Sequence, residues 1–354
     1  MSSFAIFRFP RQSRYTKMVQ EYGEPERVGS LSALNGKSGF VVAPFEQSPA
    51  CPVLLIHPDR VEENDIPQRA DCSALALSQT GKGEERELYA EVFAKFHRQL
   101  EEGRFSKIVL SRRSEVEFDG RLDLEKLFFK ACHLYPRAFV ALVSSPLCGT
   151  WLMATPEVLL SGEGLRFSTM ALAGTMELHG DSLGFDVEGS GFDGGKIVWS
   201  KKNIEEQHYV EAYLEETIKR FSTDINKSKP YTARAGNLVH RRTDFSFTLA
   251  DTSKMGSLIA ALHPTPAVCG MPKDEACRFI IANESSPRSY YSGFSGPLMH
   301  NGATHLYVSL RCMSIGSGRC SLYAGGGLLR ESDEQREWDE TEAKMKTMMN
   351  VLRP

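Results

Sequence analysis

The sequence of 354 residues has no long apolar run, no large excess of charge of either sign and no paired-cysteine motif. No stretch approaches the roughly 20 consecutive apolar residues that span a bilayer, which argues against a membrane protein. The formal net charge of -3 provides no overall basic field, which disfavours nucleic acid as a partner. The composition is therefore that of an ordinary globular protein, and we expect its partner to be a small molecule.

The eight cysteines include no C-x-x-C pair and no spacing typical of zinc ligands. We expect them to be reduced thiols in a cytoplasmic protein. The first twenty residues interleave basic and hydrophobic side chains, with neither a continuous apolar segment nor a small-residue cleavage site. This pattern predicts no secretion signal.

Apolar residues recur at helical spacing in a few segments and alternate as in strands in many more. The predicted helices cover 84–102, 201–222 and 253–261, followed by a carboxylate-rich helix near the C-terminus. The predicted strands cover 39–43, 52–56, 105–118, 138–144, 151–160, 165–175, 307–315 and 319–324. We expect hairpin turns at 161–164 and 316–318, and a mobile Gly/Asp-rich loop at 180–195. With neither a repeat nor a clear linker, residues 1–354 are predicted to form a single α+β domain with extensive antiparallel sheet.

The C-terminal run LYAGGGLLRESDEQREWDETEAK places three glycines at the end of a strand and a carboxylate-rich helix soon after them. At about 100° per residue, Glu337, Glu340 and Lys344 share one strip that borders the apolar face of this helix. A solvated charged face is the commoner explanation of such a strip, because charged residues are seldom buried without a partner. The alternative is a metal-assisted anion site.

Two ionisable residues stand in apolar surroundings. Lys107 lies on the same side of its strand as Phe105 and Val109, so it either pairs or has a lowered pKa, unless it is a solvent-exposed edge lysine. Glu157 directly follows Pro156 within an apolar segment, where a carboxylate needs a partner or a proton. If it keeps the proton at neutral pH it can act as a general acid; otherwise it is an ion-pair member or exposed.

Glu206 lies at the edge of the apolar stripe of the helix predicted over 201–222, and it is the carboxylate there most able to face a site. A solvated acid that complements the helix dipole is the commoner role at such a position. Together with Glu337 and Glu340 it offers hard oxygen ligands for Mg²⁺, which usually takes one or two protein carboxylates and leaves room for substrate.

Three further features can contact an anion or only support the fold. His263 lies in the stiff segment LHPTPAVCGMP and either touches a ligand or caps the turn. The glycine run at 325–327 lets backbone amides approach an anion, but it lacks the Gly-Lys-Ser/Thr ending of a nucleotide-binding loop. Arg311 in YVSLRCM can clamp a carboxylate bidentately, although a strand arginine is more often a surface ion pair.

Seven strings resemble the chorismate-utilising enzymes and occur in the same order as in that family: KIVLSRR, ATPEVLL, LAGT, LHPTPAVCGMP, RSYYSGFSG, VSLRC and YAGGG followed by EWDETEAK. The resemblance covers about residues 90–352, while residues 1–90 match weakly. It implies the fold of that family, an α/β domain in which two large, mainly antiparallel sheets pack together with helices outside. It also implies a Mg²⁺-dependent site between the sheets.

The resemblance further implies an isomerase, isochorismate synthase, that serves menaquinone or siderophore biosynthesis. Lys107 matches the lysine with which isochorismate and salicylate synthases activate water, and Ala173 in LAGT matches the same branch. The loop HPTPAVCGMP resembles that of isochorismate synthases. Salicylate synthase is the nearest alternative, then an aminating anthranilate or aminodeoxychorismate synthase component I, and then a chorismate-binding protein without turnover. No glutamine amidotransferase partner is expected.

The residue roles that the resemblance implies are specific. Lys107 acts as the base and Glu157 as the acid, with Glu206 and Glu340 as Mg²⁺ ligands and Glu337 as a further ligand through water. The expected substrate-binding residues are Gly174, Thr175, His263, Arg311, Gly325 and Lys344. Asn203 stands where the family usually has aspartate, and Gln207 stands where histidine is common, so the first ligand helix departs from the family pattern.

Overall fold

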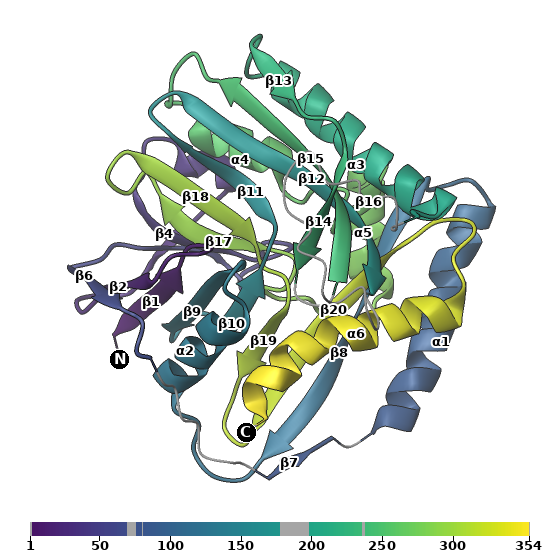
Figure 1. The fold of residues 1–354 in the computed structure, drawn as a ribbon, viewed down its shortest axis with the longest axis horizontal. Helices are drawn as coiled ribbons and strands as arrows, with labels where there is room; N and C mark the ends of the chain where they lie inside the picture. The colour runs from purple at the N-terminus through teal and green to yellow at the C-terminus, as the bar shows by residue number, and fades with distance from the viewer. Residues whose placement is uncertain (1, 69–75, 80, 178–197, 236–237, 354) are drawn as a thin grey trace.

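The computed structural model describes residues 2–68, 76–79, 81–177, 198–235 and 238–353, and two ten-stranded antiparallel sheets dominate its architecture (Figure 1). The first sheet contains, in spatial order, β16 (Gly270–Met271), β8 (Lys107–Phe118), β20 (Arg319–Leu328), β19 (Cys312–Ile315), β10 (Gly149–Thr155), β9 (Phe139–Ser145), β1 (Ser3–Arg8), β2 (Arg14–Gln20) and β6 (Arg60–Asp65), with β7 (Leu77–Ser78) beside β8. The second contains β13 (Ile225–Lys227), β15 (Leu238–Thr248), β12 (Arg166–Glu177), β11 (Val158–Glu163), β18 (Ala303–Val308), β17 (Phe294–Leu298), β4 (Gly39–Ala43), β5 (Val53–Ile56) and β3 (Glu26–Val28), with β14 (Tyr231–Ala235) beside β15.

Helices cover the outer faces of both sheets. They are α1 (Lys82–Glu101), α2 (Leu124–Leu134), α3 (Lys201–Lys219), α4 (Met255–Leu262), α5 (Lys273–Asn283) and α6 (Glu334–Leu352), with a short 3-10 helix, η1, at Leu31–Leu34. Helix α3 packs on β12 and β15 of the second sheet, whereas α6 packs on β20 of the first sheet (Figure 1). The predicted arrangement of two packed antiparallel sheets with helices outside is therefore confirmed. No helix in the described part of the chain is both long and apolar enough to cross a membrane.

An apolar and aromatic layer fills the space between the sheets. Phe139 of β9 stacks on Tyr307 of β18 with ring centroids 4.0 Å apart, which joins the two sheets directly. Phe7 of β1 and Phe40 of β4 also join the two sheets, through tilted rings with centroids 5.4 Å apart. Strands from the first 65 residues thus belong to both sheets and to the core between them.

Side-chain caps fix where the helices that carry site residues begin. Ser200 accepts a hydrogen bond from the amide of Asn203 at the start of α3, and Asp333 accepts one from the amide of Arg336 at the start of α6. Such caps satisfy amides that lack a partner within the helix. The rotation and register of α3 and α6 are thereby set, and with them the directions of Glu206, Glu337 and Glu340.

Two of the predicted strands were wrong, because each is in fact a pair of strands in different sheets. The segment predicted as one strand over 151–160 ends as β10, crosses at Pro156 and continues as β11 in the other sheet. The segment over 307–315 divides in the same way between β18 and β19. Proline cannot donate to a strand ladder, and Arg311 has a φ of 46°, so neither segment continues straight. Apolar residues lie on both sides of each crossing because the crossings are buried, and so the sequence pattern showed no interruption.

The remaining element predictions hold with two qualifications. The hairpins β11–β12 and β19–β20 form as predicted. The three glycines continue β20 opposite β8 instead of ending the strand, which corrects the expectation for 325–327. The predicted loop at 180–195 lies outside the described residues. The seven cysteines in the described ranges are free thiols, and Cys72 lies outside them.

Candidate active site

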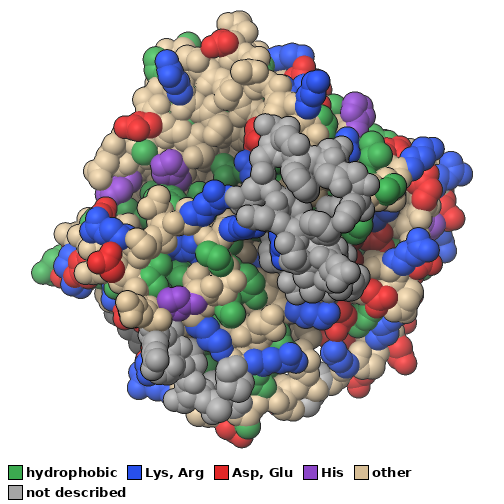
Figure 2. Space-filling view, in the orientation of Figure 1, with side chains coloured by type: hydrophobic (Ala, Val, Ile, Leu, Met, Phe, Trp, Pro, Cys, Tyr) green, Lys and Arg blue, Asp and Glu red, His purple; other side chains and the backbone are tan. Residues whose placement is uncertain are grey.

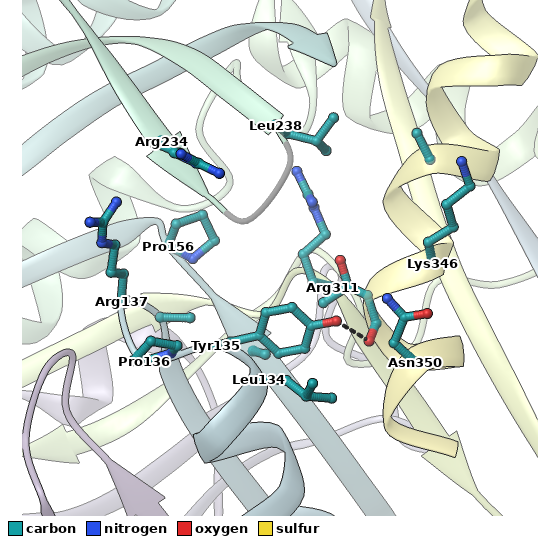
Figure 3. Close-up of a pocket in the computed structure, with 14 residues that line it drawn as sticks. Leu134, Tyr135, Pro136, Arg137, Pro156, Arg234, Leu238, Arg311, Lys346 and Asn350 are labelled. Carbon is teal, nitrogen blue, oxygen red and sulfur yellow. Dashed lines mark hydrogen bonds between the residues drawn. The ribbon is translucent and has the colours of Figure 1, made fainter. Parts of the chain in front are cut away.

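The two sheet crossings place Glu157 and Arg311 between the sheets. The amide of Val308 donates to the carbonyl of Glu157 at 3.0 Å, and the amide of Ala154 donates to the carbonyl of Arg311 at 3.1 Å. The first crossing is therefore hydrogen-bonded to β18, which leads into the second crossing. The second crossing is hydrogen-bonded to β10, which leads into the first. A cavity of about 60 Å³ lies there, lined by Glu157, Arg311 and residues of β12, β15 and β20. A larger cavity of about 540 Å³ adjoins it at Pro156 and Arg311 (Figure 3).

Glu157 is a buried carboxyl group with 3% of its surface exposed. Burial raises its pKa to about 8, although the positive charges of Lys107, Lys344 and Arg311 act in the opposite direction. The loss of hydration destabilises the charged carboxylate by more than the three cations stabilise it. Glu157 consequently keeps its proton at neutral pH, as a general acid requires.

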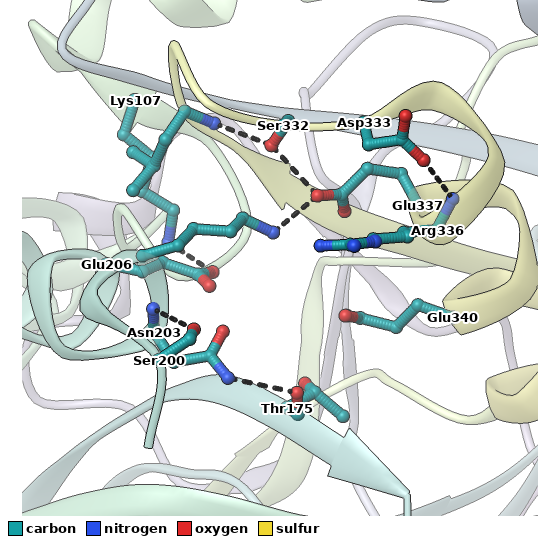
Figure 4. A network of polar contacts seen from close by, with 12 residues as sticks. Lys107, Thr175, Ser200, Asn203, Glu206, Ser332, Asp333, Arg336, Glu337 and Glu340 are labelled. Atoms are coloured by element: carbon teal, nitrogen blue, oxygen red, sulfur yellow. Dashed lines mark hydrogen bonds and ion pairs between the residues drawn. The ribbon is translucent and has the colours of Figure 1, made fainter. Parts of the chain in front are cut away.

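Lys107 is completely buried at the start of β8, so it is not an exposed edge lysine. Its Nζ lies 3.1 Å from Oε1 of Glu206 on α3 (Figure 4). The two groups form an ion pair, but their geometry is not that of a hydrogen bond, and Nζ has no hydrogen-bond acceptor among the described residues. A buried ammonium with unused donors is costly, so this position is suited to a water molecule or a substrate oxygen.

Each of the three predicted carboxylate ligands is paired with a lysine in this structure. Besides the pair of Lys107 with Glu206, Lys202 pairs with Glu337, and Lys344 lies 2.6 Å from Oε1 of Glu340. Glu337 and Glu340 lie on one strip of α6, as predicted. Among the described residues, no group of three or more His, Cys, Asp or Glu side chains is close enough to hold a metal together.

Burial raises the pKa of Glu337, whereas Lys344 and Lys202 outweigh burial and lower the pKa of Glu340. Oε2 of Glu337 is buried and has no hydrogen-bond partner among the described residues. An unpaired buried carboxylate oxygen is a natural cation ligand, and Mg²⁺ prefers such oxygens. The donor types therefore fit Mg²⁺, provided that the lysines shift from the carboxylates.

The glycines of β20 make room for these carboxylates. A Cβ atom at Gly327 would overlap the Glu206 carboxylate and lie 2.8 Å from Cε of Lys107, and one at Gly326 would lie 2.9 Å from Oε2 of Glu337. Pairing with β19 ends at Tyr323, just before the glycines. Groups from α3 and α6 can thus approach β20 closely, and the carbonyl of Gly325 accepts a hydrogen bond from Lys344 at 2.8 Å.

Gly174 and Thr175 border the same small cavity. The β12–β15 register shifts between Ala173 and Thr175, and Gly174 has a φ of 71°. A Cβ there would also lie 2.9 Å from the carbonyl oxygen of Asn203. This bulge is available only to glycine in practice, and it turns the strand toward the cavity.

His240 is a site residue that the sequence analysis missed. Its Nε2 lies 3.2 Å from Nη2 of Arg311, and its Nδ1 lies 3.3 Å from Oγ1 of Thr175. Burial, together with Arg311 and Lys344, lowers the pKa of His240 to about 3, so the ring is neutral. Nε2 then accepts from Arg311, and Nδ1 carries the proton. The one sequence feature that could have indicated His240 is its position two residues after Leu238, on the same side of a strand. No strand was predicted for this segment.

His263 lies away from this cavity, which does not support its expected role in substrate binding. Its Nε2 is 3.0 Å from the carbonyl oxygen of Pro44 and 3.3 Å from that of Phe45, and its ring packs edge-on against Phe294. Its ring therefore joins the segment after α4 to the end of β4, a structural role that differs from both capping of its own turn and contact with a ligand in this cavity.

The two departures from the family pattern on α3 also have structural partners. Gln207 accepts from the amide of Ala173 at 2.9 Å and donates to the carbonyl of Ala171 at 3.0 Å. Asn203 donates to the carbonyl of Thr175 at 3.3 Å. Both side chains tie α3 to the bulged strand β12.

Comparison with known proteins gives a consistent picture. The model of a family described as "Chorismate binding enzyme" matches residues 57–353. Isochorismate synthase EntC of Escherichia coli (strain K12) is 30% identical over 247 residues, which are 70% of this chain and 62% of that protein. Isochorismate synthase DhbC of Bacillus subtilis (strain 168) is 28% identical over 261 residues, which are 72% and 64% of the two chains. The chain thus covers less than two thirds of these relatives.

Solved structures share the fold over nearly the whole chain. A putative 2,3-dihydroxybenzoate-specific isochorismate synthase, DhbC from Bacillus anthracis, superposes with a TM-score of 0.84 at 24% identity, covering 99% of this chain and 96% of that one. Anthranilate synthase component I from Streptococcus pneumoniae gives a TM-score of 0.72 at 16% identity, covering 98% and 89%. At these identities the likeness shows the fold alone.

Proposed function

Because the chain belongs to the chorismate binding enzyme family, we propose that it is an isochorismate synthase, which adds water at C2 of chorismate and releases the C4 hydroxyl. The observation that carries this proposal is the pair of buried ionisable groups at the site. Lys107 has unused hydrogen-bond donors, and Glu157 keeps its proton. Addition of water and loss of hydroxide need a base and an acid of this kind.

In the proposed reaction, Lys107 in its neutral form takes a proton from the water that attacks C2. The ring double bonds shift, and Glu157 gives its proton to the departing C4 hydroxyl. The protons balance, since the proton gained by Lys107 equals the one lost by Glu157. This role requires Lys107 to release its contact with Glu206, so that the amine faces the attacking water.

Mg²⁺ is the cation that we propose for this position, held by Glu206 and Glu340, with Glu337 as a further ligand. Bound Mg²⁺ supplies positive charge that holds and orients a carboxylate of the substrate. The unpaired Oε2 of Glu337 and the close approach of all three carboxylates to the glycines of β20 support this assignment. Lys107, Lys202 and Lys344 are the residues that must move from these carboxylates.

Arg311 is the proposed partner of the other substrate carboxylate. Burial lowers its pKa to about 10, which still leaves the guanidinium charged at neutral pH. His240 and Thr175 hold it through consecutive hydrogen bonds. Lys344 and the backbone around Gly174 and Gly325 complete the proposed substrate contacts.

The inner cavity of about 60 Å³ is smaller than the roughly 300 Å³ or more of a typical small-molecule site. Binding of chorismate therefore requires side chains to move, and the lysines paired with the three carboxylates are the natural ones. Their movement exchanges ion pairs within the protein for ion pairs with the substrate.

The experiment is incubation of the protein with chorismate and Mg²⁺, with and without ammonia, followed by chromatography of the products. We expect isochorismate in both cases. Salicylate and pyruvate would identify a salicylate synthase instead, and an aminated product that depends on ammonia would identify a component I enzyme. Chorismate binding without any product would indicate a protein that has lost turnover.

We further propose a cytoplasmic enzyme that works without a glutamine amidotransferase, since water and not ammonia is the nucleophile. Two further relatives are described by different pathways: an isochorismate synthase of Vibrio cholerae is described as vibriobactin-specific, and MenF of Escherichia coli is described as menaquinone-specific. Both menaquinone and siderophore synthesis therefore remain candidate pathways for the product.

A further inference from the structure

Two cysteine thiols meet where β16 leads into helix α5. Cys269 directly precedes β16 and is completely buried, whereas Cys277 lies one turn into α5 and is half-buried. Their side chains form a hydrogen bond with each other. Sγ of Cys269 also lies 3.7 Å from the carbonyl oxygen of Lys273, which is four residues before Cys277 and so one helical turn away from it. The two sulfur atoms are thus neighbours in the folded chain.

Cys277 has the features of the more reactive thiol. The hydrogen bond from Cys269 lowers the pKa of Cys277 more than burial raises it. The same hydrogen bond, together with burial, raises the pKa of Cys269. Because the thiolate is the nucleophile in thiol–disulfide exchange, the half-buried Cys277 is the thiol that reacts with an oxidant first. The buried Cys269 is then placed to attack it.

The backbone of Cys269 is hydrogen-bonded to the strand that carries the proposed base. Its carbonyl accepts from the amide of Val109 at 2.6 Å, and β16 pairs with β8 at Lys107. Strand β16 also packs against α5 (Figure 1). The segment that follows Cys269 therefore lies between the helix that carries Cys277 and the backbone of Lys107.

The packing between α5 and β8 leaves no spare room at this segment. A Cβ atom at Gly270 would lie 2.6 Å from the carbonyl oxygen of Lys107 and 2.8 Å from Cβ of Ala276. Close-packed contacts transmit a displacement and do not absorb it. Since Ala276 adjoins Cys277, a movement of Cys277 toward Cys269 moves β16 against β8 at Lys107.

We propose that Cys269 and Cys277 form a reversible disulfide that lowers the activity of the site when the protein is oxidised. The thiolate of Cys277 attacks a disulfide oxidant, which releases one thiol and leaves a mixed disulfide on Cys277. Cys269 then loses its proton, attacks Sγ of Cys277 and releases the second thiol. The protein loses two electrons and two protons, and the oxidant gains them.

The loss of activity follows from the position of Lys107, because small displacements of a group that transfers a proton slow the reaction strongly. This effect on activity rests on the proposed function. Formation of the disulfide does not, so the two are measured separately.

The test is oxidation of the folded protein with hydroxyethyl disulfide, followed by peptide mapping by mass spectrometry and by assay of isochorismate formation. Basic and acidic side chains lie close together on the face of the molecule in Figure 2, and a neutral oxidant is neither attracted nor repelled by them. We expect a disulfide between Cys269 and Cys277 and a fall in turnover of about tenfold or more. Dithiothreitol should restore the activity.

Cys277→Ser should form no such disulfide and should keep its activity in the oxidant. Cys51→Ser is the matched control, because Cys51 is also a half-buried free thiol, and it should respond like the unaltered protein. Thermal unfolding of the reduced variants checks that they fold, and Cys269→Ala replaces Cys277→Ser if the latter does not.

The inference is overturned if the oxidant leaves both thiols free, or if the disulfide forms and turnover is unchanged. It is also overturned if Cys277→Ser loses activity in the oxidant as the unaltered protein does. If the reduced, unaltered protein makes no isochorismate, the proposed function fails. The disulfide is then judged by peptide mapping, and its effect on the site by calorimetric binding of chorismate before and after oxidation, where equal affinities would overturn the effect.

Discussion

Two buried cations on strand β8, Lys107 and Arg112, differ in how fully their hydrogen-bond donors are used. Arg112 donates to Thr341 at 2.7 Å, pairs with Glu85 and Glu342, and lies over the ring of Trp338 at 3.7 Å. Lys107 faces one carboxylate and has no hydrogen-bond acceptor in the described part of the chain. They are five residues apart, so they point to opposite faces of the sheet.

This difference distinguishes a buried charge that stabilises the fold from one that is available for chemistry. The partners of Arg112 come from α1 and α6, so its charge joins two helices to the first sheet. Lys107 points between the sheets, where its unused donors face the site. Carboxylates show the same contrast. Glu284 accepts from Arg288 and from the amide of Ser111, whereas burial leaves Glu157 protonated.

Removing the amine at position 107 should have the largest effect. We expect Lys107→Ala to lower turnover by about 10² or more, as loss of a general base does. The change also leaves the Glu206 carboxylate without its ion-pair partner, so some stability should be lost as well, and turnover is expressed per folded molecule. Product formation and thermal unfolding measure the two effects, and turnover like that of the unaltered protein would refute the role of Lys107.

Glu157→Gln should lower turnover by about 10² while raising stability at alkaline pH. Folding raises the pKa of Glu157 from 4.5 to about 8. The unfolded chain therefore ionises first, and the free energy of unfolding falls as pH rises from about 4.5 to about 8. Glutamine does not ionise, so the variant should lose less stability over this range. Denaturant titrations at several pH values check the sign, and parallel pH curves for the two proteins would contradict it.

The same titration governs the activity of the unaltered enzyme. The proposed acid must be protonated, so kcat/KM should fall as pH rises through about 8. A pH profile of kcat/KM shows this limb directly. Activity that continues to rise well above this pH would mean that another group supplies the proton.

Arg112→Ala should mainly lower the free energy of unfolding, whereas Lys107→Ala should mainly lower turnover. Breaking a buried ion pair by removing one partner typically costs about 3 to 5 kcal/mol, and here Glu85 and Glu342 both lose their partner. Turnover per folded molecule should fall far less than in Lys107→Ala, since the partners of Arg112 are Glu85, Thr341 and Glu342 and do not include the proposed acid or base. Urea unfolding and activity at low temperature measure the two quantities. A large loss of turnover without a loss of stability would end the proposed contrast between these residues.

Glu340→Ala should have the smallest effect. We expect the Mg²⁺ concentration for half-maximal activity to rise about tenfold. Glu342→Ala, two residues further on α6, is a suitable control because its carboxylate pairs with Arg112 and Lys82. An unchanged Mg²⁺ titration for Glu340→Ala would remove this residue from the proposed ligands.

The sequence predicted the hairpins, the main helices and the strip of Glu337, Glu340 and Lys344, because each depends on local periodicity. It failed at Pro156 and Arg311, where an apolar segment passes from one sheet to the other. The spacing of apolar residues indicates which residues are buried. Because the residues on both sides of such a crossing are buried, the spacing does not show where one strand ends and the next begins. The pairs of Lys107 with Glu206 and of Lys202 with Glu337 also escaped prediction, since their partners come from different elements and meet only in the folded chain.

His240 and His263 also show that local sequence patterns do not reveal which residues meet at the site. Both are single histidines beside apolar residues, and the stiff, proline-rich segment around His263 directed attention to it. The β12–β15 register places His240 opposite Thr175 at the bulge, whereas His263 turns toward the carbonyls of Pro44 and Phe45. Only the sheet register decides which histidine faces the cavity.

The most direct test of the central claim is the reaction of chorismate with Mg²⁺ in water labelled with heavy oxygen, followed by mass spectrometry of the product. Water addition activated by Lys107 predicts isochorismate with the label in its C2 hydroxyl, formed by the unaltered protein and by Arg112→Ala but scarcely by Lys107→Ala. Isochorismate without the label, or labelled product formed equally fast by Lys107→Ala, would contradict the account.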